Sequence, residues 1–235
     1  ASVTCATPSL PPLPPSPPPP PSPESPPEPP ASPPAEPASV FSDTYNLRDA
    51  LGEWCADAAA AQVTHGLIAW WDVSAVTDME YLLPWACQST FDEDLNAWDV
   101  GQVTSMSSMF NYASAFNQPV EAWDVGQVTS MSSMFSSAYA FNQPVASWDV
   151  GQVTSLSSMF SDASAFNQPV GAWDVGQVTS MSSMFSSAYA FNQPVASWDV
   201  GQVTSMSVRR AARVGGHRGL GGRFIRPPAC PLGVR

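Results

Sequence analysis

The sequence predicts an α/β repeat solenoid, with short parallel strands on one face, short helices on the other and a helical cap at its N-terminal end. The main observation is a fixed step of 25 residues. The octapeptide WDVGQVTS begins at Trp98, Trp123, Trp148, Trp173 and Trp198, and FNQPV begins at Phe116, Phe141, Phe166 and Phe191. A looser copy, WDVSAVTD, begins at Trp71, 27 residues before Trp98. Self-similarity at such a period is typical of stacked repeat architectures.

Composition divides the chain into four regions. Residues 1–39 hold 18 of the 26 prolines and predict a disordered, extended stalk, with a PxxP ligand as the alternative. Residues 40–66 are expected to form the helical cap. Residues 67–207 form six repeat units, of which the first is atypical and the last is truncated. Residues 208–235 hold seven of the eight arginines and predict a disordered basic tail, or a gene-model artefact because the composition changes so abruptly.

The cap is predicted from a change of period. Apolar side chains at Leu47, Ala50, Leu51 and Trp54 follow the spacing of an amphipathic helix over residues 46–58. Asn46 is the expected N-cap of this helix. A cap is needed because the first repeat of a stack otherwise exposes an apolar end. His65, in the turn that follows, is interpreted as structural or exposed.

Each repeat is expected to contain one helix and one strand. In the unit that starts at Trp123, four apolar residues follow helical spacing, with Thr129 or Ser130 as N-cap: Met131, Met134, Phe135 and Ala138. The segment Val145–Val150 carries β-branched and aromatic residues and predicts the strand. Strands of successive repeats would then pair in parallel.

Positions that differ between the copies are expected to face solvent. Tyrosine appears at such positions at Tyr112, Tyr139 and Tyr189, and Glu121 is another variable position. Aromatic rings on a rigid support suit the flat faces of sugars or the side chains of a partner protein. These four residues are therefore the candidate ligand-binding residues.

The repeat also predicts a row of carboxylates about 5 Å apart. Its members are Asp99, Asp124, Asp149, Asp174 and Asp199. Because like charges at this distance repel, the row predicts either side-chain bonds to turn amides or a calcium-binding ladder. No other cofactor is expected.

The net charge, the apolar runs and the cysteines limit which partners, membrane segments and metal sites the chain can have. A formal net charge of -12 argues against nucleic acid or an anionic membrane. No apolar run is long enough for a transmembrane helix. The four cysteines match no metal-site spacing, and a Cys55–Cys87 disulfide is the expected pair if the protein is secreted. The sequence starts at Ala1 without a methionine, and it leaves open whether a signal peptide precedes this residue.

The repeat pattern W-D-V-x-x-V-T-x-M-x-x-[ML]-F, continued by F-N-Q-P-V, resembles the BspA-like leucine-rich-repeat surface proteins and the lipoprotein-associated repeats grouped with them. The resemblance covers roughly residues 45–207 and implies a leucine-rich-repeat-like fold, an extracellular or cell-surface location, and a role in adhesion and partner binding. It implies no catalytic residues. The first unit departs from the pattern, because residues 81–87 read YLLPWAC where other units have the Met-Phe segment.

Enzymatic activity has little support, since the chain lacks a repeated nucleophile–base pair, a phosphate loop and metal motifs such as HExxH. Two functions remain. One is a recognition or adhesion module that binds an extracellular glycan or protein. The alternative is a passive structural component of a cell wall or matrix. The sequence leaves the oligomeric state open.

Overall fold

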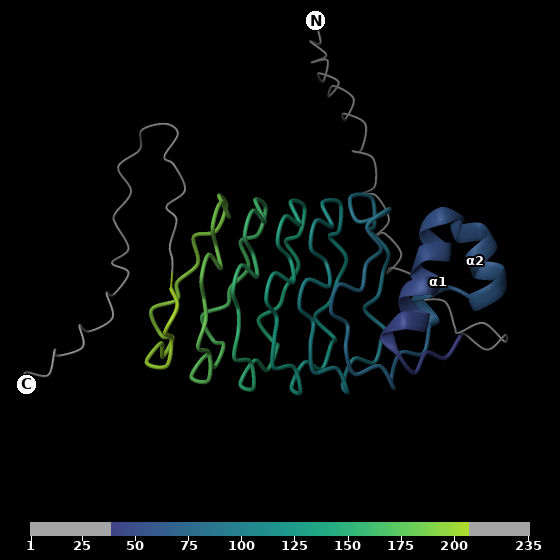
Figure 1. Cartoon of the computed structure of the whole chain (residues 1–235). Helices are drawn as coiled ribbons and strands as arrows, with labels where there is room; N and C mark the ends of the chain where they lie inside the picture. Colours follow the sequence, from purple (N-terminus) through teal and green to yellow (C-terminus); the bar gives the residue numbers. More distant parts are fainter. Residues whose placement is uncertain (1–38, 207–235) are drawn as a thin grey trace, which may run out of the picture. The chain divides into compact units, whose positions relative to one another are not determined.

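The computed structural model describes residues 39–206. The predictions for the proline-rich stalk and for the basic tail therefore lie outside the described residues, apart from Ser39. Two α-helices and one 3-10 helix stand at the N-terminal end: α1 (Thr44–Ala56), α2 (Ala58–His65) and η1 (Ile68–Trp70). The repeats that follow lie side by side as successive coils of the chain (Figure 1).

The cap helices begin at aspartates. Asp43 is the N-cap of α1, and its side chain accepts a hydrogen bond of 2.9 Å from the Asn46 amide. The expected cap at Asn46 is therefore wrong, because α1 starts two residues before it. Asp57 ends α1 and caps α2 by accepting a bond of 3.1 Å from the Ala60 amide. Gly66, with φ of 75°, follows the last residue of α2.

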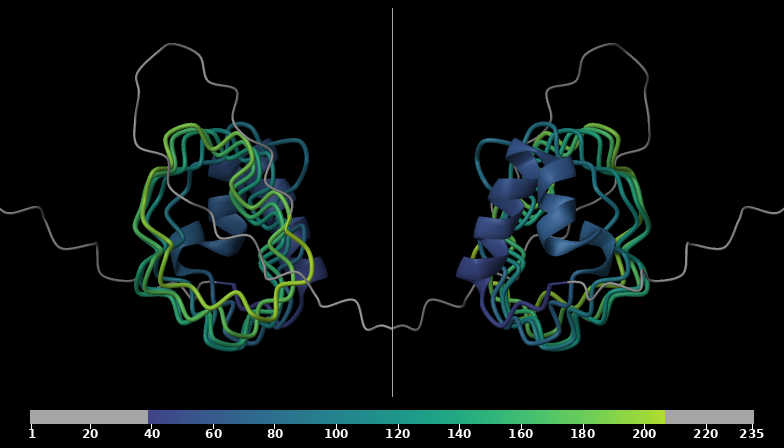
Figure 2. Two further views of the ribbon diagram at one scale, coloured as in Figure 1. Left: turned by 90° about the vertical axis from the view of Figure 1, so that its left-hand side faces the viewer. Right: turned by 90° about the vertical axis from the view of Figure 1, so that its right-hand side faces the viewer.

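Helix α1 covers the first coil with its apolar face. Leu47, Leu51 and Trp54 are buried there. The Trp54 ring meets the Trp71 ring edge-on, with 5.9 Å between the centroids, and Trp71 stacks on Trp98 at 6.4 Å. The end view shows both helices across one end of the coils (Figure 2). The hydrophobic core is thereby continuous from the helices into the repeats.

The predicted alternation of strand and helix within each repeat is wrong. After η1, the described residues up to Met206 contain turns, bends and isolated bridges, and no helix or extended strand. The repeats of this chain are thus not those of an α/β solenoid with strands on one face and helices on the other.

Positive φ angles explain why the helical spacing gives no helix. Ser133 and Ser137 have φ of 56° and 60°, which an α-helix of L-residues does not allow. The Met134 amide bonds to Met131 three residues back, whereas the Phe135 amide bonds to Met159 in the next repeat, at 2.9 Å. Since alternate amides bond within and between repeats, the segment is a run of turns. Apolar side chains still point inward at the same positions, so periodicity alone cannot separate the two structures.

The strand was predicted in the wrong segment. Within Val145–Val150, the Trp148 amide turns back to the Val145 carbonyl at 3.3 Å and forms no ladder. Parallel bridges instead join one residue per repeat at the segment expected to cap the helix. They link Asp78, Ser105, Ser130, Ser155, Ser180 and Ser205 in that order. One bridge per coil is too short to count as a strand.

Buried rings and indole hydrogen bonds hold the coils together. Phe135 stacks on Phe160 with 5.7 Å between centroids, and both side chains are fully buried. The Trp148 indole N–H donates to the carbonyl of Val120, 28 residues earlier in the chain, at 3.0 Å. The same bond recurs at each tryptophan that opens a repeat, from Trp98 to Trp198. The indole thus buries an apolar ring and satisfies its only donor, which explains why tryptophan recurs at this position.

Candidate functional site

One row of residues carries two exposed tyrosines. Hydrogen bonds between adjacent coils fix its register: the Ala140 amide bonds to Ser114, the Ala165 amide to Tyr139 and the Ala190 amide to Ser164, each at 3.2 Å. The row therefore runs through Ser89, Ser114, Tyr139, Ser164 and Tyr189. Tyr139 and Tyr189 stand two coils apart, with a serine between them.

Tyr112 belongs to the same edge of the coils. Its amide donates to the Ser136 carbonyl of the next repeat at 2.8 Å, so it lies opposite the segment that leads into Tyr139. Its φ of 60° places it at the tip of a turn. Tyr112 is 59% exposed, Tyr139 51% and Tyr189 67%. The structure thus brings the three sequence-predicted tyrosines to one edge.

Trp85 extends this edge and was missed from the sequence. The segment that contains Trp85 is hydrogen-bonded at both of its ends to the coil that carries Tyr112. The Tyr81 amide donates to the Ser107 carbonyl at 3.0 Å, and the Ser114 hydroxyl donates to the Ser89 carbonyl at 3.0 Å. Trp85 is 89% exposed. The two extra residues of the first repeat were the signal that could have found it. We call Trp85, Tyr112, Tyr139 and Tyr189 the aromatic edge.

A disulfide joins Cys55 of α1 to Cys87, the pair named from the sequence, with 5.6 Å between their Cα atoms. Cys87 lies two residues from Trp85 and within the same anchored segment. The bond therefore ties the first part of the aromatic edge to the cap helix.

Glu121 lies apart from the tyrosines in the register of the coils. It falls in the row of Asn96, whose side chain accepts from the Ala122 amide at 3.3 Å. The Glu121 carbonyl in turn accepts from the Ser147 hydroxyl at 3.3 Å. Five or more residues of each coil separate this row from the tyrosine row, so Glu121 is not grouped with the aromatic edge.

The aspartate row is built from side-chain-to-backbone turns. Each carboxylate accepts a bond of 3.0 Å from the glycine amide two residues on, at Asp99, Asp124, Asp149, Asp174 and Asp199. The bonds fix the turn after each tryptophan. Among residues 39–206, no three side chains of the metal-binding types gather closely enough to hold an ion.

The first repeat has a serine in place of this glycine. Asp72 accepts from both the Ser74 amide, at 3.0 Å, and the Ser74 hydroxyl, at 2.7 Å. The hydroxyl bond, followed by the amide bond, lowers the pKa of Asp72 below its ordinary value.

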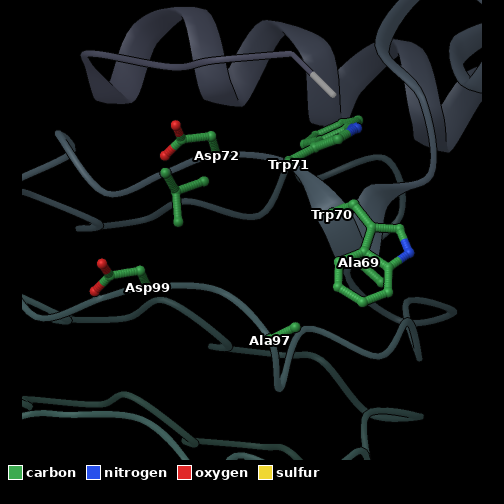
Figure 3. Close-up of a pocket in the computed structure, with 7 residues that line it drawn as sticks. Ala69, Trp70, Trp71, Asp72, Ala97 and Asp99 are labelled. Carbon is green, nitrogen blue, oxygen red and sulfur yellow. The ribbon is translucent and has the colours of Figure 1, made fainter. Parts of the chain in front are cut away.

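A small pocket lies between the first two coils (Figure 3). Its volume is about 180 Å³, and it is lined by Ala69, Trp70, Trp71, Asp72, Val73, Ala97 and Asp99. Figure 3 shows the carboxylates of Asp72 and Asp99 on one side and the Trp70 indole on the other, with the carboxylates directed away from the ring. Ligand pockets usually exceed about 300 Å³. The size and the divergent groups therefore favour the aromatic edge over this pocket as the main binding surface.

His65 links Ser39, in the segment before α1, to the cap helices. Its Nδ1 lies 3.0 Å from the Ser39 hydroxyl and its Nε2 lies 2.9 Å from a Glu53 carboxylate oxygen. In a serine hydrolase triad the carboxylate bonds Nδ1 and the serine bonds Nε2, the reverse of this order. The Ser39 amide also bonds to the His65 carbonyl at 3.1 Å. The group acts as a clamp on the segment that enters α1, in line with a structural histidine.

Comparison with protein families identifies the repeats. The family described as "Mycoplasma protein of unknown function, DUF285" matches residues 55–163 and 122–212, which together cover more than half of the chain. The chain belongs to this family. Comparisons with curated proteins and with solved structures gave no match. Across residues 39–206, the helices are too short and too polar to span a membrane.

Proposed function

We propose that this protein is a non-enzymatic recognition or adhesion module, which binds an extracellular glycan or protein through the aromatic edge. The exposed rings on one edge of the stack carry the proposal. Most other large apolar side chains of the repeats are buried, down to 0% exposure for Phe110, Phe135 and Phe160, and the exceptions include Tyr81 at 53% and Met206 at 43%. Aromatic side chains with an apolar face and a polar tip are typical of binding surfaces.

The surroundings of the edge support a preformed site. The backbone on either side is fixed by hydrogen bonds of 2.8–3.2 Å between coils, at Tyr112, Ala140 and Ala165. Rings held on such a support lose little freedom on binding, so more of the contact energy is available for affinity. Binding that needs no rearrangement suits an adhesion surface.

We further propose an extracellular or cell-surface location. The Cys55–Cys87 disulfide supports it, since such bonds persist in oxidising compartments. The serine–proline runs of residues 1–39 and the resemblance of the repeats to BspA-like surface proteins point the same way. The formal net charge of -12 argues against anionic partners such as nucleic acid.

An array of glycans and extracellular proteins, probed with the full chain, tests the proposal. The matched variant replaces Tyr112, Tyr139 and Tyr189 by alanine, while Tyr45→Ala removes an equally exposed ring from α1. We expect saturable binding that the triple variant loses and the Tyr45 variant keeps. The alternative, a passive structural component, predicts a folded chain with no saturable partner.

A further inference from the structure

The spacing of the aromatic edge contains information about the ligand. Tyr139 and Tyr189 are separated by two coil steps. Backbone-bonded segments stand about 5 Å apart, and the nearby Phe141, Phe166 and Phe191 rings are separated by 6.1 and 6.0 Å. The two tyrosines therefore stand roughly 10–12 Å apart along the stack.

We propose that the aromatic edge binds a neutral, extended β-1,4-linked polysaccharide whose chain runs along the stack of coils. This inference rests on the proposed function and names the ligand class of the same edge. The disaccharide repeat of such a polysaccharide has about the same length as two coil steps, so every second sugar presents the same apolar face. Tyr139 and Tyr189 can then stack on equivalent sugars, whereas Tyr112 and Trp85 lie in the two coils before Tyr139 and do not share this two-step spacing.

The charges along the stack favour a neutral ligand. Among residues 39–206, the basic side chains are Arg48 in α1 and His65 in α2, so the repeats offer no cation to an acidic sugar. An anionic polysaccharide would also meet the carboxylate of Asp162, which lies on the aromatic edge. A neutral polysaccharide needs no cation and is not repelled by carboxylates, and its hydroxyl groups remain paired with water or with polar side chains.

Polar groups stand between the rings where sugar hydroxyls would lie. Ser164 occupies the position between Tyr139 and Tyr189, and its hydroxyl donates to the Tyr139 carbonyl at 3.4 Å, which leaves its oxygen free to accept. Asp162 occupies the Tyr112 position two repeats later, where its carboxylate accepts from Ser161 at 3.1 Å. The two rings of Tyr139 and Tyr189, with a hydroxyl and a carboxylate acceptor in the coil between them, match a sugar chain, which presents apolar faces and hydroxyl rims in turn.

The repeats allow a test in which composition stays constant and only the spacing changes. The double variant Ser164→Tyr with Tyr189→Ser moves the second ring to the adjacent coil. Both residue types already occur in this row, so the fold should tolerate the exchange. Cellohexaose is the probe, maltohexaose is the curved α-linked control, and titration calorimetry on the full chain measures the dissociation constants.

We expect cellohexaose to bind at least about tenfold more tightly than maltohexaose. The moved-ring variant should weaken cellohexaose binding about three- to tenfold, the loss expected for one stacked ring. Tyr45→Ala should leave the affinity unchanged. Equal affinities for the two hexasaccharides, equal affinities of wild type and moved-ring variant, or no binding of cellohexaose would each overturn the inference.

The proposed function can be judged separately. If cellohexaose does not bind while the array shows a protein partner that the triple tyrosine variant loses, the polysaccharide inference fails and the recognition module stands. If neither the array nor the hexasaccharides show binding that depends on the aromatic edge, both fail.

Discussion

The cost of removing a core ring should depend on its place in the stack. Phe160 is fully buried and has stacked rings on both sides: Phe135 and Phe185 each lie 5.7 Å away, and Phe166 lies 3.8 Å away within its own repeat. Phe160→Ala should lower the free energy of unfolding by about 3–5 kcal/mol, the usual loss for a buried phenylalanine.

The equivalent change at Phe185 should cost less. Phe185 is half-buried, whereas Phe160 is fully buried. It keeps Phe160 and Phe191 as ring partners, the latter at 3.9 Å. Since part of its surface is already exposed to water, Phe185→Ala should cost about 2 kcal/mol.

Urea denaturation followed by circular dichroism measures both losses. Phe160→Leu is the control, and should cost less than about 1.5 kcal/mol because it nearly conserves volume. A stack stabilised by contacts between neighbouring coils predicts the larger loss at Phe160. Equal losses at the two positions would refute this reasoning.

Three further predictions concern the cap and the first repeat. Replacing Cys55 and Cys87 by serine should cost about 2–4 kcal/mol in urea denaturation, and a reductant should then destabilise only the wild type. Ser74→Gly should raise the pKa of Asp72 toward its ordinary value, which a carboxyl NMR titration measures. Because the folded pKa is lowered, the stability that Asp72 contributes is present above about pH 4 and lost as the pH falls through the folded pKa, so wild type and variant should converge in acid. Asp57→Ala should cost about 1 kcal/mol through loss of the α2 N-cap, as thermal unfolding would show.

The sequence predicted the 25-residue repeats, but not the backbone within a repeat. Apolar residues at Met131, Met134, Phe135 and Ala138 point inward in a helix and also in a run of turns. What distinguishes them is the positive φ at Ser133, for which serine gives little signal.

The candidate site was predicted in part. The tyrosines were found because they interrupt otherwise identical copies, and the coil register places them on one edge. Trp85 was missed because it lies in the two-residue insertion, where the repeat pattern offers no equivalent position. Glu121 was grouped with the tyrosines only because it also varies. The position of Glu121 in the coil is fixed by hydrogen bonds such as the one that the Ser147 hydroxyl donates to the Glu121 carbonyl. No sequence pattern shows such bonds.

Tyrosine nitration tests the central claim most directly. The full chain is treated with tetranitromethane alone and with a partner captured from the array, and modified residues are read by mass spectrometry. The account predicts that the partner protects Tyr112, Tyr139 and Tyr189 while Tyr45, at 73% exposure on α1, reacts as before. Equal reactivity of the three edge tyrosines with and without the partner would contradict it.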